Sequence, residues 1–360
     1  MIQVFKKWLN DYFADEEAIS LLLILVCALL LVIYAGHMLT PVIIAIIIAY
    51  LLQGVVQQLT RWLPETLAVS LTFVFFCGLF LLALFLALPI IGKQLTNLVA
   101  ELPKLVRQLQ ALLLELQGRY PHLLSQQQTD ELVALAAREA RNIGQLLLDF
   151  SLASIPNIFA VLVYMVLTPI LVFFLLKDRR QILGWLAAFL PERRPLMRAV
   201  WGEMNTQVAN YARGKAVEIV IVGGVSYVTF TLFGLQYAAL LALLVGLSVL
   251  IPYIGAAAVT LPIAVIGYLQ WGPSQIFVYL LVAYGVIQFL DGNVLVPLLF
   301  SEVVNLHPVA IIVAVLFFGG IWGLWGVFFA IPLATLVKAL LQAWPKGLQQ
   351  VELREEGLCE

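Results

Sequence analysis

Charge is scarce in this sequence. Only 11% of its 360 residues are Asp, Glu, Lys or Arg, whereas 63% are hydrophobic. No ionised side chain occurs from Ala18 to Thr60, and neither Lys nor Arg occurs from Ala216 to Val337. A water-soluble domain carries roughly a quarter of its residues as charged side chains, which cover its surface. This composition therefore excludes an ordinary soluble fold.

Residues that carry catalysis or bind metals are also few. The three cysteines lie far apart and predict no disulfide framework: Cys27, Cys77 and Cys359. The three histidines lack the spacing of metal ligands: His37, His122 and His307. There is no phosphate-binding glycine loop and no nucleophile elbow. We therefore expect no enzyme activity, no metal and no cofactor, and the net charge of −1 gives no reason to expect nucleic acid.

Long apolar runs take the place of these features. A hydrocarbon core about 30 Å thick is crossed by ~20 apolar residues in a helix. The runs are rich in Leu, Ile, Val and Phe without strict alternation, so they do not resemble the strands of an outer-membrane barrel. The sequence predicts an all-α polytopic membrane protein with about eight transmembrane segments, some of them broken or re-entrant.

The first three spans are expected near the amino terminus. Acidic residues precede the first apolar run, and no small-residue cleavage site follows it, so it predicts a retained anchor rather than a signal peptide. Gly36, His37 and Pro41 predict a turn between the first two spans. The three spans are expected at residues 18–36, 38–53 and 66–91.

An amphipathic segment follows. Between Lys93 and Asp149 an apolar residue recurs every third or fourth position, as in a coiled coil. Pro103 is expected to kink the first helix or to mark a restart. Ser125 and Gln128 have the spacing of a capping box for a second helix. The segment predicts a helical hairpin outside the bilayer, on the extracytoplasmic side.

The remaining chain returns to the membrane. Residues 152–176 predict the fourth span, and the basic, amphipathic residues 181–215 follow it. Further apolar segments lie at 216–234, 237–251, 255–271, 274–290 and 307–341. The last of these would be about 52 Å long as one helix, so it predicts two passes, a hairpin or a protruding helix.

Positive charge predicts the orientation. The segment from Lys177 to Lys215 holds eight Lys and Arg and should be cytoplasmic. Both termini are then cytoplasmic, the number of passes is even, and the membrane is the bacterial inner membrane. The expected divisions are the tail and first spans (1–91), the external hairpin (92–150), the fourth span (151–178), cytoplasmic amphipathic helices (179–215), a carboxy-terminal membrane bundle (216–341) and a cytoplasmic tail (342–360).

Asp291 is the strongest candidate for chemistry. An Asp at mid-membrane costs about 3 kcal/mol, so such a residue usually faces a cavity or a partner. The functional interpretation is a substrate or proton site; the alternative is an interfacial residue in a turn, which the sequence Asp291-Gly-Asn293 favours. Glu302 is expected at the cytoplasmic interface, and Glu218 in a structural ion pair near Arg213 and Lys215.

Breaks in the apolar segments form the second signal. Transporters bind solutes where helices are interrupted at membrane depth, although each break could also be an interfacial turn. The residues that mark the breaks are Pro252, Gly255, Asp291, Asn293, Pro297, Asn305 and His307.

Small residues form the third signal. Their spacing of four, three and four predicts one helix face that packs closely on a neighbour or acts as a hinge. The residues are Gly319, Gly323, Gly326 and Ala330, with Gly320 beside them.

Several of these motifs together resemble the AI-2E family, which is named for autoinducer-2 export. They are Leu250-Ile-Pro-Tyr-Ile-Gly255, Asp291-Gly-Asn293 with Pro297, Asn305-Leu-His-Pro308, Gly319-Gly-Ile-Trp-Gly-Leu-Trp-Gly326 with Ile331-Pro332, and Tyr211-Ala-Arg-Gly-Lys215. The resemblance covers nearly the whole chain. It implies a permease or exporter, with some relatives linked to autoinducer-2 and others to Na⁺/H⁺ antiport, and it implies homo-oligomers such as a pentamer.

The leading hypothesis is therefore a permease that moves an unidentified small solute across the lipid bilayer, with Asp291 as the coupling or substrate residue. A cation/proton antiporter is the second hypothesis, because Asp291, Glu218 and Glu302 are ionisable. A non-transporting oligomeric scaffold that uses the external hairpin is the third.

Overall fold

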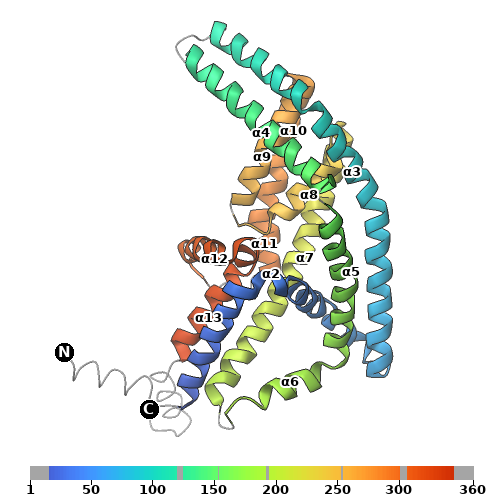
Figure 1. Ribbon diagram of the computed structural model, residues 1–360, viewed down its shortest axis with the longest axis vertical. Helices are drawn as coiled ribbons and strands as arrows, with labels where there is room; N and C mark the ends of the chain where they lie inside the picture. The colour runs from blue at the N-terminus through green and yellow to red at the C-terminus, as the bar shows by residue number, and fades with distance from the viewer. Residues whose placement is uncertain are drawn as a thin grey trace, which may run out of the picture. The chain divides into compact units, whose positions relative to one another are not determined.

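The computed structural model describes residues 16–119, 125–152, 154–191, 194–252, 254–300 and 306–343. Every regular element in these ranges is a helix, which confirms the expected all-α fold. In chain order they are α2 (Glu16–Leu59), α3 (Glu65–Arg119), α4 (Gln126–Leu152), α5 (Ser154–Lys177), α6 (Arg179–Ala187), α7 (Pro195–Phe233), α8 (Ala238–Ser248), α9 (Ile254–Trp271), α10 (Gln275–Leu290), the π-helix η1 (Asp291–Leu295), α11 (Val296–Phe300), α12 (Pro308–Phe328) and α13 (Ala330–Ala343) (Figure 1).

Seven segments within the described ranges are long and apolar enough to cross a membrane, so the chain is a multi-pass membrane protein. They are Ile19–Gly36, Met38–Leu59, Glu65–Glu115, Pro195–Phe233, Ile254–Trp271, Gln275–Phe300 and Pro308–Phe328. Three shorter apolar helical segments accompany them: Val163–Lys177, Ala238–Ser248 and Ala330–Leu341.

The chain divides into two compact units. The first unit combines Met1–Val74, Leu167–Val217 and Val296–Glu360. The second unit combines Phe75–Val166 and Glu218–Leu295. Helices α3, α5 and α7 contribute residues to both units, so neither unit is a continuous stretch of sequence.

The first two expected spans are both present, as Ile19–Gly36 and Met38–Leu59, but they lie in one helix, so the predicted turn at Gly36–Pro41 is wrong. Helix α2 is continuous over 44 residues, with Pro41 inside it, although it changes direction part-way along (Figure 1). The Thr40 hydroxyl donates to the Gly36 carbonyl at 3.4 Å, as in a helix. Gly36 is needed for packing instead, because a Cβ there would lie 2.5 Å from Nε1 of Trp322.

Helix α3 also joins two expected elements. It runs unbroken for 55 residues through Pro89 and Pro103, so the third span continues into the amphipathic segment without a boundary at residue 92. Pro103 marks no restart. Each proline removes one backbone donor, and the helix continues on both sides of it.

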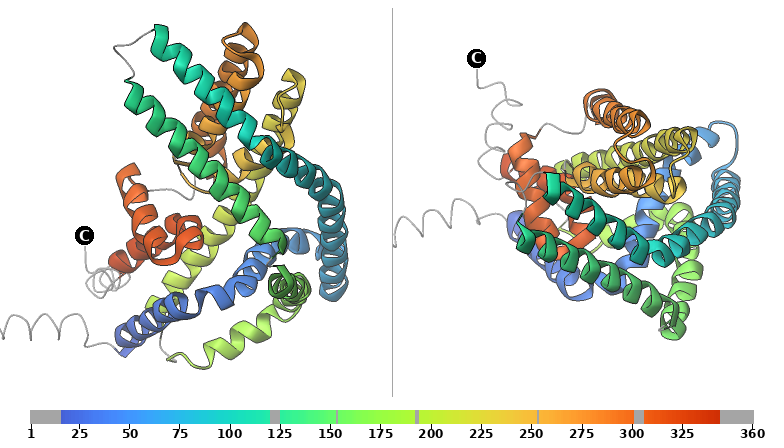
Figure 2. Two further views of the ribbon diagram at one scale, coloured as in Figure 1. Left: turned by 45° about the horizontal axis from the view of Figure 1, so that its top comes forward. Right: turned by 90° about the horizontal axis from the view of Figure 1, so that it is seen from above.

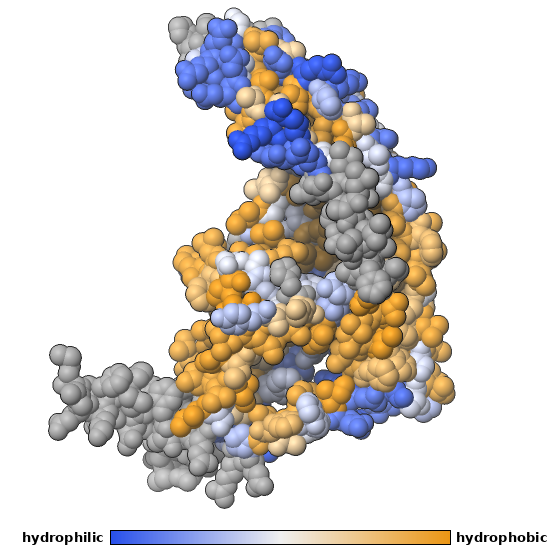
Figure 3. All heavy atoms as spheres, viewed as in Figure 1, coloured by the Kyte–Doolittle hydropathy of each residue, from blue (hydrophilic) through white to orange (hydrophobic). Residues whose placement is uncertain are grey.

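The capping box that begins α4 is confirmed. The Ser125 Oγ accepts from the Gln128 backbone N–H at 3.2 Å, and the Gln128 Oε1 accepts from the Ser125 N–H at 3.0 Å. Helix α4 runs beside the carboxy-terminal part of α3 (Figures 1 and 2). Hydrophilic side chains gather over this pair (Figure 3). The two helices therefore form the expected hairpin; its extracytoplasmic location stays a prediction.

The core of the second unit lies among α7, α8, α9 and α10. Phe230, Leu241 and Leu280 are fully buried there. Helices α7 and α8 approach closely at Gly223 and Gly246, since a Cβ on Gly246 would lie 3.2 Å from the Gly223 Cα. Helix α7 continues through residue 215, and the division between the two units falls inside it, between Val217 and Glu218.

In the first unit, the start of α7 is held by α2. The buried Glu17 carboxylate accepts a hydrogen bond of 2.7 Å from the Met197 backbone N–H. An anionic side chain is stabilising at a helix amino terminus, where the backbone N–H groups have no partners within the helix. Leu196 and Val200 pack nearby in the same cluster as Leu21.

The last apolar segment is a hairpin rather than one long helix. At Gly323 the backbone leaves the helical conformation, with φ 59° and ψ −134°. A Cβ on Gly326 would then collide with the Phe318 carbonyl, and one on Gly319 would lie 2.8 Å from Val327 Cγ2. The expectation that Gly319, Gly323, Gly326 and Ala330 share one helix face is therefore wrong. Gly323 turns the chain, and Gly319 and Gly326 let its two arms approach.

Candidate functional site

A polar face on α10 is the main candidate site in the second unit. Tyr284, Gln288 and Asp291 are spaced by four and three residues, so they share one side of the helix. Tyr284 is 2% exposed, and its hydroxyl donates to the Ala256 carbonyl of α9 at 3.3 Å. The Gln288 Nε2 donates to the Tyr284 hydroxyl at 2.9 Å. Polar groups thus follow each other along a helix that is otherwise apolar.

The break between α8 and α9 lies beside this face. Helix α8 ends at Ser248, and α9 begins at Ile254, after the turn that contains Pro252. A Cβ on Gly255 would collide with the Ser248 carbonyl, so only glycine lets the two helices meet there. Ala256, the acceptor for Tyr284, is the next residue. The structure therefore brings the predicted break together with α10.

The predicted break at Asp291 has a different form from a turn. Residues 291–295 form a single stretch of π-helix between α10 and α11, so the backbone stays helical. The Asn293 Nδ2 donates to the Phe289 carbonyl at 2.9 Å, and Asp291 is half-buried. The predicted turn is therefore wrong, whereas the depth of Asp291 in the membrane stays a prediction. Short π-helical segments occur frequently at functional sites because they re-aim side chains.

The other predicted residues lie elsewhere. Pro297 is exposed on α11. His307 caps α12, since its Nδ1 accepts from the Val309 N–H at 3.3 Å. Glu218 is 2% exposed on α7. Glu302 and Asn305 lie outside the described residues.

The buried segment Tyr211–Lys215 in the first unit is one of the motifs that resemble the AI-2E family. Tyr211 is 1% exposed and lies with its ring centroid 5.9 Å from that of Phe300. A Cβ on Gly214 would lie 2.5 Å from a Phe300 ring carbon. The Lys215 Nζ lies 5.2 Å from the centre of the same ring, a cation–π contact, with Lys215 only 6% exposed. Lys215 lies next to a long apolar segment, and a lysine in that position is the feature of the sequence that indicates this buried motif.

A second feature, which the sequence does not predict, links α3 to the start of α8 in the second unit. The Tyr237 hydroxyl donates to Oε2 of Glu101 at 2.7 Å, and the Leu240 N–H donates to Oε1 of Gln94 at 2.9 Å. Burial, with the neighbouring Glu101 carboxylate as the second cause, raises the pKa of Tyr237 to about 12. The neutral hydroxyl is thus retained as the donor that joins the two helices.

Sequence comparison identifies the family. The model described as "AI-2E family transporter" matches residues 19–346. The chain belongs to the AI-2E family. It is 43% identical to "Putative permease PerM" of Escherichia coli (strain K12) over 353 residues, which cover 96% of this chain and 99% of that protein. It is 25% identical to "AI-2 transport protein TqsA" of the same strain, over 91% of this chain and 92% of the relative.

Membership of the AI-2E family places the polar face of α10 in a transporter. Polar side chains within membrane-spanning helices are costly, and they usually face a cavity or another polar group. Among the described residues, no three His, Cys, Asp or Glu side chains come together to hold a metal ion. The chemistry available on α10 is that of a hydroxyl, an amide and a carboxylate, which suits a polar solute or a cation.

Proposed function

We propose that this AI-2E protein is a permease that moves a small polar solute across the bacterial inner membrane along the polar face of α10. The observation that carries the proposal is the row of Tyr284, Gln288 and Asp291. This row begins at the contact with Ala256, beside the α8–α9 break, and ends at the first residue of the π-helix. Transporter sites commonly combine interrupted helices with free carbonyls and a few side chains. The proposed function of the protein is therefore transport rather than catalysis.

The three side chains would act in different ways. Tyr284 and Gln288 are already hydrogen-bonded to each other and to α9, so they would offer a fixed pair of polar groups to a solute. Asp291 supplies the negative charge for a cation, a proton or a solute hydroxyl. The π-helix aims that carboxylate differently from a regular helical turn.

The proposed orientation has both termini in the cytoplasm. Its support is the eight Lys and Arg residues between Lys177 and Lys215, since such charge accumulates on the cytoplasmic side of the membrane. The α3–α4 hairpin then lies outside the cytoplasm.

We also propose a homo-oligomer, as the family resemblance implies for a form such as a pentamer. Its support is the broad apolar surface of α3, where Phe85, Leu86 and Leu88 are each at least 60% exposed. Lipid and neighbouring subunits would share this surface.

A cation/proton antiporter is the second candidate. The specific observation in its favour is the half-buried Asp291 within a π-helix. A carboxylate there could exchange a proton for a cation, as intramembrane acidic residues do in other transporters.

Flux into proteoliposomes tests the proposal. Purified protein is reconstituted and assayed with autoinducer-2, because one relative is named an AI-2 transport protein. A second assay adds Na⁺ outside the liposomes and follows proton movement with a pH-sensitive dye inside them. We expect flux above empty liposomes for one probe, at least ten-fold slower flux in Asp291→Asn, and unchanged flux in Asp130→Asn, the same substitution on exposed α4. If the Asp291→Asn protein gives the same flux as the unmodified protein, Asp291 has no part in the mechanism. Coupled movement of Na⁺ and H⁺ in opposite directions would favour the antiporter.

A further inference from the structure

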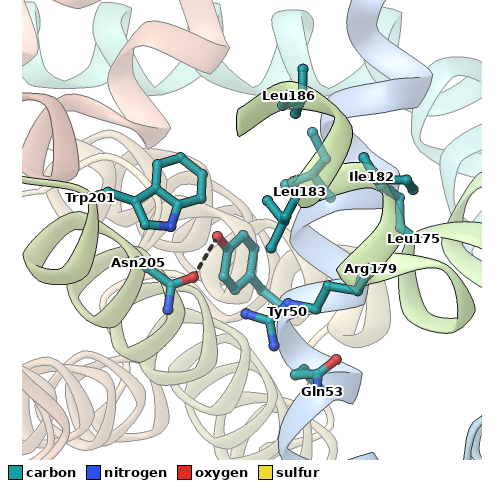
Figure 4. A pocket seen from close by; sticks show the side chains of 11 residues that line it. Tyr50, Gln53, Leu175, Arg179, Ile182, Leu183, Leu186, Trp201 and Asn205 are labelled. Atoms are coloured by element: carbon teal, nitrogen blue, oxygen red, sulfur yellow. Dashed lines mark hydrogen bonds between the residues drawn. The ribbon is translucent and has the colours of Figure 1, made fainter. Parts of the chain in front are cut away.

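Two adjoining pockets lie in the first unit, away from the polar face of α10. The first has a volume of about 200 Å³ and is lined by residues of α2, α5, α6 and α7 (Figure 4). The second has a volume of about 630 Å³ and is lined by α2, α5, α6 and the turn before α3. Gln53, Arg179 and Leu183 line both, so the two spaces meet at these side chains.

The first pocket is mainly apolar. Its walls include Ile46, Leu175 and Ile182, which come from three different helices. At one side the Tyr50 hydroxyl donates to Oδ1 of Asn205 at 3.0 Å and ties α2 to α7 (Figure 4). A space with such walls excludes a strongly hydrated ligand and suits a hydrocarbon chain.

The second pocket is polar. Arg179, Arg180 and the amide side chains Gln53 and Gln57 line it. Arg180 is paired with Glu65 at 3.8 Å on the exposed rim. Within the described part of the chain, no ion pair is recorded for Arg179, and its guanidinium reaches towards Tyr50 and Gln53 in Figure 4. The pocket therefore carries the guanidinium groups of Arg179 and Arg180 but only one carboxylate, that of Glu65, and this excess of positive charge favours the binding of an anion.

Helix α6, which forms one wall of both pockets, carries exposed aromatic residues on its surface. Trp185 is 63% exposed and Phe189, just beyond the helix, is 71% exposed, with ring centroids 4.9 Å apart. Trp62, in the turn that borders the polar pocket, is 87% exposed. Exposed aromatic residues beside arginines are typical of helices that lie at the membrane–water interface.

We propose that the two pockets together bind one anionic phospholipid. The headgroup phosphate is held by Arg179 and Arg180 in the polar pocket, and part of an acyl chain enters the apolar pocket beside Ile46. Arginine matches a phosphate through two parallel N–H donors. The position of α6 fits a lipid of the leaflet that faces the basic segment, where anionic headgroups attract Lys and Arg. This site goes beyond the proposed transport and does not depend on it.

Lipid retention by the full-length protein in detergent tests the site. Native mass spectrometry counts bound dioleoyl phosphatidylglycerol during a titration, with dioleoyl phosphatidylcholine as the uncharged-headgroup control. We expect phosphatidylglycerol to bind to the unmodified protein and Arg179→Gln to weaken its binding at least ten-fold, because the change removes the charged donor that holds the phosphate. Arg198→Gln removes the same charge from an exposed position on α7 outside both pockets and should leave binding unchanged.

Two further variants separate the parts of the site. Arg180→Gln changes a side chain that is 90% exposed, so it should fold normally and give a smaller loss. Ala49→Phe fills the apolar pocket and should reduce phosphatidylglycerol binding without changing the charge. Equal losses in Arg179→Gln and Arg198→Gln, or equal binding of the two lipids, would overturn the proposal. Displacement of phosphatidylglycerol by an equal concentration of inorganic phosphate would assign the site to a free anion and would overturn it too.

Discussion

Gly36 of α2 lies directly against the indole of Trp322 in α12, so that a Cβ on Gly36 would be 2.5 Å from the Trp322 Nε1. This contact joins α2 to the α12 hairpin beside its tip at Gly323, where the backbone reverses. Both residues belong to the first unit. The glycine that looks like a turn signal in the sequence is therefore a packing site for a tryptophan.

Gly36→Ala should destabilise the protein because the added methyl group displaces Trp322. Over-packing of this kind costs about 1–3 kcal/mol in free energy of unfolding. Thermal unfolding in detergent measures the change. Gly78→Ala in α3 is the matched control, because nothing lies within 4 Å of its Cβ position, and it should be neutral or slightly stabilising. Equal stability of the Gly36→Ala and Gly78→Ala proteins would contradict the contact.

Gly323→Ala should also destabilise the protein, for a conformational reason. At φ 59° and ψ −134° a side chain is strained even in open space, at a cost of about 1–3 kcal/mol. Gly320→Ala, three residues earlier in the same helix and equally uncrowded, should have little effect. The same unfolding assay compares the two. A Gly323→Ala protein as stable as Gly320→Ala would show that α12 does not reverse there.

The hydrogen bond from Tyr237 to Glu101 predicts a stability that depends on pH. Because the pKa of Tyr237 is raised to about 12 in the folded protein, above the ordinary value of 10.0, its contribution is fully present below pH 10. The contribution is then lost as the pH rises through about 12. Tyr237→Phe should lower the free energy of unfolding by roughly 1.5–3 kcal/mol at pH 8.

The measurement is thermal unfolding of both proteins between pH 8 and 12. The difference between them should be constant up to about pH 10 and should shrink above it. Tyr279→Phe, on the exposed side of α10, is the control and should match the unmodified protein at pH 8. A difference that stays constant or grows from pH 10 to 12 would contradict the assigned pKa.

Local signals in the sequence predicted local structure well. The capping box of Ser125 and Gln128 needs only residues three apart, and both of its hydrogen bonds are present. Apolar content predicted the helical membrane fold because each span must satisfy its backbone hydrogen bonds internally. The break at Pro252 was also visible, since Pro and Gly fall there within an apolar run.

Glycine and proline have two physical meanings in a sequence, and the turn predicted at Gly36–Pro41 is wrong for this reason. Glycine and proline mark turns in soluble proteins, but Gly36 provides space for Trp322, and Pro41, Pro89 and Pro103 lie inside continuous helices. Helix continuity is favoured where an unpaired backbone group would be costly.

The polar face of α10 was only partly predicted. Asp291 was identified by its charge, but Tyr284 and Gln288 are uncharged, and their importance depends on the contact with Ala256 in α9. The sequence does contain a signal for this face: Tyr284 and Gln288 are four residues apart, and Asp291 follows three residues later in the same apolar segment. The two pockets of the first unit could not be predicted, because each is lined by helices that are distant in the sequence.

Cysteine accessibility on α10 tests the central claim, a polar path along this helix, without knowledge of the solute. In a protein whose Cys27, Cys77 and Cys359 are replaced by Ala, single cysteines are placed at Gln288 and Asp291, and at Val286 and Phe289 on the opposite, exposed side. A membrane-impermeant methanethiosulfonate reagent is then applied to membrane vesicles. We expect rapid reaction at positions 288 and 291 and none at positions 286 and 289. Reaction at 286 and 289 with none at 288 and 291 would contradict it.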